Sequence, residues 1–138
     1  MSVIPCVRIK DGVKIDPLTP ALARILSALD IAARWRGHDL TITCGREGHL
    51  AGDPHTIGRA VDVRVLDLTP DSTVKFYQYI RSLLGDLFTV LYETPIQPTY
   101  PALQNIAYLN TKATAAHFHI QLAKGQADYP PKEAAVPA

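Results

Sequence analysis

The sequence predicts an α+β fold in which helices cover one face of a mainly antiparallel sheet and leave the other face open. The first observation behind this prediction is the order of the expected elements, which runs helix, strand, strand, helix, strand, strand. The second is that three of the expected strands alternate between apolar and polar residues, so each would bury only one face. No internal repeat divides the 138 residues, so we expect a single domain spanning residues 1–138.

Two segments carry the start and stop signals of helices, over residues 19–37 and 69–85. Each begins with Thr-Pro, where the threonine suits the N-cap and the proline suits the first helical position. Each ends at a glycine, which is typical of a helix C-terminus. The apolar residues that recur at helical spacing in the first segment are Leu22, Ile25, Leu26 and Leu29.

Four segments are expected to form strands, over residues 39–45, 60–65, 87–93 and 115–122. In the first, strict alternation predicts one face with Leu40, Ile42 and Cys44 and the opposite face with Thr41 and Thr43. The segment 94–105 contains three prolines and is expected to be an irregular loop. The folded core is expected over about residues 18–123, followed by a loosely ordered tail over 125–138.

Composition argues against several classes of protein. A formal net charge of +1 without a Lys/Arg cluster gives no support for nucleic-acid binding. No apolar run is long enough to span a bilayer, and the N-terminus does not resemble a signal peptide. We therefore expect synthesis in the cytoplasm, with delivery to any site outside by other means. Cys6 and Cys44 are more simply two partly buried thiols than a disulfide, although pairing stays open.

The polar face of the expected sheet gathers residues that can bind metal. It carries Thr41, Thr43, Asp62, Arg64, His117 and His119. If the strands share a sheet, the imidazoles and the Asp62 carboxylate can converge with His55, which precedes the second strand. Two imidazoles and one carboxylate, with a fourth position left to water, are typical of a catalytic zinc site. Gly58 and Ala60 allow a tight turn and close packing between these ligands. An ordinary polar sheet face without metal is the alternative.

Three separated motifs resemble those of one family. HTIGRAVD at residues 55–62 is similar to the H-x-x-G-x-A-x-D motif of the zinc D-Ala-D-Ala peptidases. TITCGR at 41–46 resembles that family's strand ending in a Ser/Thr-Gly-x-Arg-like turn, and HFHIQL at 117–122 resembles its last H-x-H strand. The superfamily also includes phage endolysins, murein endopeptidases and the hedgehog signalling domain. The resemblance covers about residues 20–123 in the expected order.

The resemblance implies a role for each matching residue. Zn²⁺ would be held by His55, Asp62 and His119, and His117 would lie beside the metal and contact the attacking water or the developing oxyanion. Arg46 would bind a substrate carboxylate or carbonyl, because a guanidinium offers a planar pair of donors. Thr43, in the strand that leads to Arg46, is assigned with it to substrate binding.

One element of the family pattern is absent. Active relatives place a carboxylate shortly before the last zinc ligand as the general base, whereas residues 111–116 contain none, and Pro54 replaces a serine found before the first ligand. General-base assistance contributes about 10² to 10⁴ in rate. The residues that we expect to act as general base in its place are, in order of preference, His117, Glu47 and Glu93. Surface solubility is the favoured interpretation of Glu93, and Asp53 is expected to point away.

The leading functional hypothesis is a zinc metallopeptidase that cuts bonds next to D-amino acids in peptidoglycan stem peptides or muropeptides. It would act as a D,D-carboxypeptidase or an endolysin-type endopeptidase, delivered to the cell wall during phage lysis or in a virion. The alternative, motivated by the missing carboxylate, is a catalytically silent zinc module with a structural or binding role, for example in a phage particle. The sequence leaves the cleaved bond, the base and the oligomeric state open.

Overall fold

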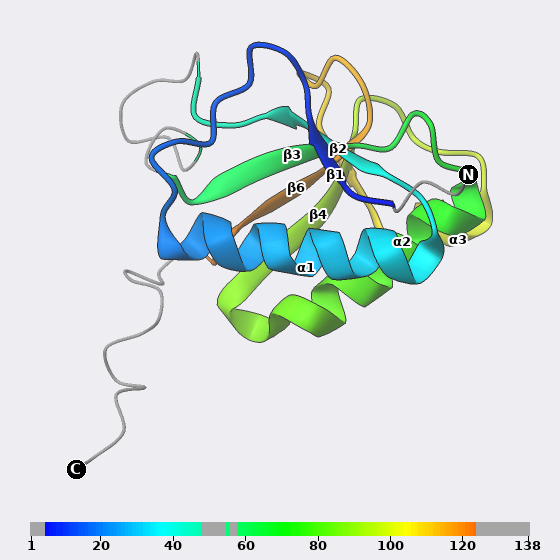
Figure 1. The fold of residues 1–138 in the computed structure, drawn as a ribbon. Helices are drawn as coiled ribbons and strands as arrows, with labels where there is room; N and C mark the ends of the chain where they lie inside the picture. Colours follow the sequence, from blue (N-terminus) through cyan, green and yellow to red (C-terminus); the bar gives the residue numbers. More distant parts are fainter. Residues whose placement is uncertain (1–4, 48–54, 56–57, 124–138) are drawn as a thin grey trace.

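The computed structural model describes residues 5–47, 55 and 58–123 (Figure 1). In chain order the elements are β1 (Val7–Ile9), α1 (Pro20–Arg36), β2 (Leu40–Cys44), β3 (Ala60–Arg64), α2 (Pro70–Leu84), the 3-10 turn η1 (Gly85–Leu87), β4 (Phe88–Thr94), α3 (Pro101–Gln104), β5 (Ala107–Leu109) and β6 (His117–Leu122). The fold is therefore α+β, as the sequence predicts. The expected loose tail lies outside the described residues.

Both long helices begin and end where their caps predict. Thr19 and Thr69 are the N-caps of α1 and α2, and each hydroxyl accepts a hydrogen bond from the backbone N–H three residues later, at 3.1 Å. Gly37 ends α1 in the left-handed conformation, with a φ of 68° that an L side chain rarely adopts. No helix of the described residues is long and apolar enough to cross a membrane.

The sheet is mixed, which corrects the prediction of a mainly antiparallel one. Its strand order is β1-β2-β3-β6-β4-β5. The inner pairs β2/β3, β3/β6 and β6/β4 are antiparallel, whereas β1/β2 and β4/β5 at the two edges are parallel. Each edge pair is joined through a helix, α1 or α3, because parallel neighbours need a crossover connection. The edge strands β1 and β5 are only three residues long. An alternating pattern cannot be recognised in so short a segment of the sequence.

The hydrophobic core lies between one face of the sheet and the two long helices, which cover that same face side by side (Figure 1). Trp35 of α1 and Tyr79 of α2 pack with ring centroids 4.3 Å apart. The largest fully buried side chains include Leu22, Ile25, Leu29, Ile42, Val61, Val63, Phe76, Ile80, Phe118 and Ile120. Burying one face of the sheet leaves the polar residues of the inner strands on the opposite face, as predicted.

The proline-rich segment is more ordered than predicted. Residues 95–100 are irregular, but Pro101 begins the short helix α3, and β5 follows it. The fixed φ of proline suits the first helical position, so the third proline starts an element instead of prolonging the loop. The sheet also begins at Val7, ahead of the expected start of the core.

Candidate metal centre

His55 is held over the open face by a tight turn. Gly58 N–H donates to the carbonyl of His55 at 3.1 Å, and Gly58 has a φ of 76°. A Cβ at Gly58 would lie 2.5 Å from Thr19 Cγ2, so only glycine fits there. The Thr19 hydroxyl donates to the Gly58 carbonyl at 2.6 Å. The start of α1 therefore anchors the turn that presents His55, whose side chain is buried.

Asp62 and His119 lie directly opposite each other on β3 and β6. Nδ1 of His119 is 2.9 Å from Oδ1 of Asp62, and Nε2 of His55 is 3.5 Å from the same oxygen. Nε2 of His119 lies 2.6 Å from Oε1 of Gln121. With its proton on Nε2, His119 donates to Gln121 and turns the lone pair of Nδ1 toward Asp62 and His55. This is the outer-shell arrangement that metal-binding histidines use.

Glu93 brings a second carboxylate to the cluster, although residues 111–116 contain none. It lies on β4 opposite His117 of β6, and it is buried, with 9% of its surface exposed. Its Oε1 is 3.4 Å from Nε2 of His117 and 3.7 Å from Nδ1 of His119. Its Oε2 accepts a hydrogen bond of 2.8 Å from the Asn110 amide. The surface role expected for Glu93 is therefore wrong.

His117 faces both carboxylates from one side of its ring. Its Nδ1 lies 3.0 Å from the carbonyl of Ala115 and must be the donor, because a carbonyl only accepts. Its Nε2 is directed at Asp62 Oδ2, at 3.8 Å, and at Glu93 Oε1. This nitrogen can take up or release a proton at the centre of the cluster.

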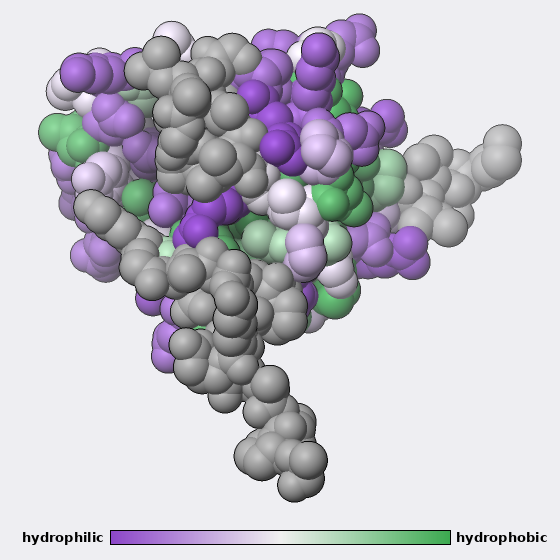
Figure 2. Space-filling view, turned by 90° about the vertical axis from the view of Figure 1, so that its left-hand side faces the viewer, coloured by the Kyte–Doolittle hydropathy of each residue, from purple (hydrophilic) through white to green (hydrophobic). Residues whose placement is uncertain are grey.

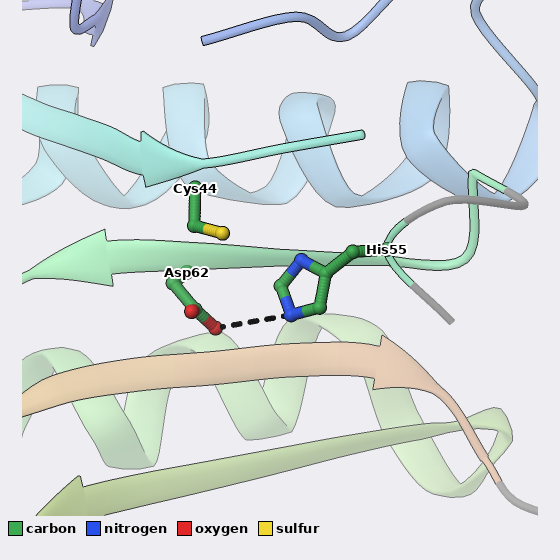
Figure 3. A group of neighbouring side chains, drawn as sticks. All are labelled: Cys44, His55 and Asp62. Carbon is green, nitrogen blue, oxygen red and sulfur yellow. Dashed lines mark ion pairs between the residues drawn. The ribbon is translucent and has the colours of Figure 1, made fainter. Parts of the chain in front are cut away.

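A β-bulge brings Cys44 to the same face. Ile42 pairs with Val63, but Cys44 pairs with Asp62. Between these two pairs β2 therefore contains one additional residue that β3 does not match. Cys44 therefore lies on the side of Asp62, and the prediction that it faces the core with Ile42 is wrong. Figure 3 shows its sulfur directed toward the Asp62 carboxylate and the His55 ring. Cys6 and Cys44 are not joined in a disulfide.

Within the part of the chain that the structure describes, two overlapping groups of these side chains could hold a metal ion, and the predicted ligand His119 is in neither of them. The first is Cys44, His55 and Asp62, and the second is Asp62, Glu93 and His117. Within each group, one ligand atom from every residue lies within 4.8 Å of the others. The histidine, carboxylate and thiol donors come from four neighbouring strands and the turn before β3.

The charges within the cluster favour an ion pair between Asp62 and His119. Burial opposes ionisation of Asp62, but the hydrogen bond from His119 and the nearby histidines outweigh it, and the pKa of Asp62 lies below its usual value. Burial likewise opposes protonation of His119, yet hydrogen bonds to Asp62 and Gln121 and the charges of Asp62 and Glu93 raise its pKa. A bound cation would replace the His119 proton as the partner of Asp62.

The cluster lies in an open cleft of about 620 Å³. Its lining includes all three clustered histidines and both carboxylates, together with Tyr108, Asn110 and Lys112 from the segment after β4. On the face shown in Figure 2, hydrophilic residues predominate in the described surface and hydrophobic residues form smaller groups. The cleft is open, and the polar side chains in its lining could contact a polar ligand beside the histidines.

Three of the predicted site residues lie apart from this cluster. The Arg46 guanidinium donates to the carbonyl of Pro17 and lies against Gly58. Thr43 is the additional residue of the bulge and is not among the described residues that line the cleft. Glu47 accepts hydrogen bonds from the N–H groups of Lys14, at 2.8 Å, and Gly45, at 3.1 Å, so its carboxylate holds the loop after β2.

Gln121 had no role in the sequence-based predictions, and Glu93 was only the third candidate for the general base. The alternation of β6 predicts that Gln121 shares a face with His119, which was the available signal for it. Glu93 was visible only as a carboxylate at the end of a strand. Asp53, expected to point away, and Pro54, at the position of the family's serine, lie outside the described residues.

Comparison with protein-family models, with curated proteins and with solved structures finds no match. Assignment to the zinc D-Ala-D-Ala peptidases therefore stays a prediction from the three motifs.

Proposed function

We propose that the protein is a zinc metallopeptidase that hydrolyses amide bonds next to D-amino acids in peptidoglycan stem peptides. The observation that carries the proposal is the buried carboxylate of Glu93, 3.7 Å from Nδ1 of His119 and beside Asp62. It supplies a general base to a donor set that otherwise matches a catalytic zinc site. The substrate class comes from the resemblance of the three motifs.

The separations between the donor atoms fit a zinc ion. Tetrahedral coordination with bonds of about 2.0–2.1 Å keeps neighbouring nitrogen and oxygen ligands about 3.3 Å apart. Nε2 of His55 is 3.5 Å from Oδ1 of Asp62, close to that value. Nδ1 of His119 is 2.9 Å from the same oxygen of Asp62, because a direct hydrogen bond joins these two atoms. His55, Asp62 and His119 would therefore hold the ion after a small movement.

Each residue around the ion would have a separate role in the reaction. When bound, zinc would lower the pKa of a coordinated water to about 7 and polarise the substrate carbonyl. Glu93 Oε1 would accept the proton of the attacking water, while Asn110 holds the other oxygen of that carboxylate. His117 Nε2, 3.4 Å from Glu93 Oε1, would stabilise the developing oxyanion or pass the proton to the leaving amine.

Two cationic side chains, Lys112 and Arg46, could bind the carboxylate of the substrate. Lys112 lines the cleft from the loop before β6 and is exposed. Arg46, which the resemblance assigns to this task, would have to leave the Pro17 carbonyl to reach a substrate. The two residues are alternatives for recognising the C-terminus of a stem peptide.

The test is turnover by the zinc-loaded protein. Peptides ending in D-Ala-D-Ala are expected to release D-alanine if it is a carboxypeptidase, and cross-linked peptidoglycan is expected to lose cross-links if it is an endopeptidase. His119→Ala should lose both zinc and turnover. Intact substrates with fully zinc-loaded protein would overturn the proposal.

A catalytically silent zinc module is the second candidate. The observation that favours it is Cys44, because a fourth protein ligand can close a zinc site, as in structural zinc centres. It predicts that zinc raises the melting temperature while peptides and peptidoglycan stay intact. Parallel melting and turnover measurements, with and without chelator, separate the two functions.

A further inference from the structure

We propose that Cys44 is a metal ligand through its Sγ, so that the centre is a Cys–His–Asp–His set and not the three-residue set of the motif. This inference shares the metal site of the proposed function. It adds a ligand that the resemblance does not assign. It also predicts a preference for thiophilic divalent cations.

The bulge in β2 is what makes this ligation possible. Without it, Cys44 would share the core-facing side of Ile42, because alternate residues of a regular strand face the same side. With it, Cys44 pairs with Asp62, and cross-strand partners in an antiparallel ladder project to the same face. Sγ, a His55 ring nitrogen and an Asp62 oxygen then lie within 4.8 Å of one another (Figure 3).

These separations suit coordination by sulfur. A Zn–S bond is about 2.3 Å and a Zn–N bond about 2.0–2.1 Å, which places sulfur and nitrogen ligands about 3.6 Å apart in a tetrahedron. The ligand atoms of Cys44, His55 and Asp62, now within 4.8 Å of one another, would settle at about that separation when an ion binds. On binding, the thiol loses its proton to solvent and the thiolate forms the metal–sulfur bond, so no oxidant or reductant is required.

Cys44 and the cleft lie on opposite sides of Asp62. In the sheet, β2 lies on one side of β3, whereas β6 and β4, which carry His117 and Glu93, lie on the other. Cys44 is not among the described residues that line the cleft, but His117 and Glu93 are. Cys44 would thus hold the ion from the β2 side, whereas water and substrate would reach it through the cleft on the side of β6 and β4.

The chemical consequence is selectivity. Thiolate ligands favour Zn²⁺ and related soft ions, whereas Mg²⁺, Ca²⁺ and Mn²⁺ prefer oxygen donors. A His–Asp–His site discriminates less strongly between these ions. Cys44 would therefore protect the centre from the abundant hard cations.

Cobalt substitution tests the proposal directly. The Co²⁺-loaded protein should show a thiolate-to-cobalt charge-transfer band in the near ultraviolet, and Cys44→Ser should lose this band. Cys6→Ser is the matched control and should keep it, because Cys6 precedes Val7, which pairs with Leu40 at the far end of β2. Bound cobalt without the band in the parent protein, or a band that survives Cys44→Ser, would overturn the proposal.

A second measurement needs no variant. Zn²⁺ should slow alkylation of Cys44 by iodoacetamide at least tenfold and leave the alkylation rate of Cys6 unchanged, as read by peptide mass spectrometry. Equal rates with and without bound zinc would contradict ligation. Cys44→Ser should also weaken zinc binding by at least about tenfold, since even an outer-shell partner contributes that much.

Failure of this inference can be distinguished from failure of the proposed function. If cobalt or zinc binds without a sulfur ligand and D-Ala-D-Ala peptides are still hydrolysed, Cys44 is not a metal ligand but the proposed peptidase function holds. A charge-transfer band with no turnover would establish the thiolate ligand and favour the silent module. Absence of any metal binding by calorimetry would overturn both.

Discussion

At the scale of single residues, the buried position of Glu93 decides what chemistry the site can perform. Residues 111–116 contain no carboxylate, yet β4 brings one to within 3.4 Å of His117 Nε2. The sequence named Glu93 as a candidate but ranked it last, because nothing local shows that β4 pairs with β6. In the proposed peptidase, the general base would thus come from a neighbouring strand instead of the segment before His117.

Glu93→Gln is therefore expected to lower kcat by about 10² to 10⁴, the usual contribution of a general base. Glutamine keeps the shape of the side chain and can still accept from Asn110. Zinc content should stay at one ion per chain, because the predicted ligands are untouched. Glu47→Gln is the control and should keep kcat, since that carboxylate binds Lys14 and Gly45. Equal losses in the two variants would argue against Glu93 as the base. Steady-state kinetics with metal analysis provides the readout.

Gln121 supports a second prediction at this scale. Its Oε1 lies 2.6 Å from Nε2 of His119 and, in the proposed zinc site, would keep Nδ1 directed at the ion. Gln121→Met removes this acceptor at similar volume, and zinc affinity should fall about 10- to 100-fold. Thr89→Val is the control, because Thr89 is the β4 partner of Gln121. Competition with a chelating dye measures both affinities, and unchanged binding by Gln121→Met would show that His119 does not depend on this contact.

At the scale of elements, the sequence predicts those parts whose signals are local. Caps define α1 and α2, and alternation defines three of the four inner strands, so His117, His119 and Asp62 could be placed on one face. The bulge at Thr43 has no sequence signal, and it moved Cys44 to the other face. The edge strands β1 and β5 depend on pairing with distant segments, which a short stretch of sequence does not reveal. The same reason hid the contact between Glu93 and His117.

The start of α1 links helix capping to the metal site, which gives a prediction with a close control. Thr19→Ala and Thr69→Ala each remove one N-cap, with equal cap distances of 3.1 Å, so each should cost about 1 kcal/mol of stability. Only Thr19 also binds the Gly58 carbonyl in the turn that presents His55. Zinc affinity should therefore fall in Thr19→Ala and stay unchanged in Thr69→Ala. Calorimetry and urea unfolding check the two quantities, and parallel changes in both variants would show that the turn is held by other contacts.

At the scale of the whole molecule, the metal donors and the hydrophobic core occupy opposite faces of one sheet. The core residues that pack β2, β3, β4 and β6 against α1 and α2 are not among the candidate metal donors. The donors nevertheless come from those same four strands and from the turn before β3. A bound ion would thus cross-link strands that the core already holds in place.

Chelation should therefore lower stability without unfolding the chain. With free zinc at about 1,000 times its Kd, binding adds about 4 kcal/mol to the free energy of unfolding. Its removal should lower the melting temperature by on the order of 10 °C in a domain of this size. The far-ultraviolet circular dichroism at 25 °C should stay unchanged, unlike that of small zinc modules that unfold without metal. His55→Ala should melt at the temperature of the chelated parent and respond little to added zinc. Loss of the helical signal on chelation would show that the open face, and not the apolar core, holds the fold together.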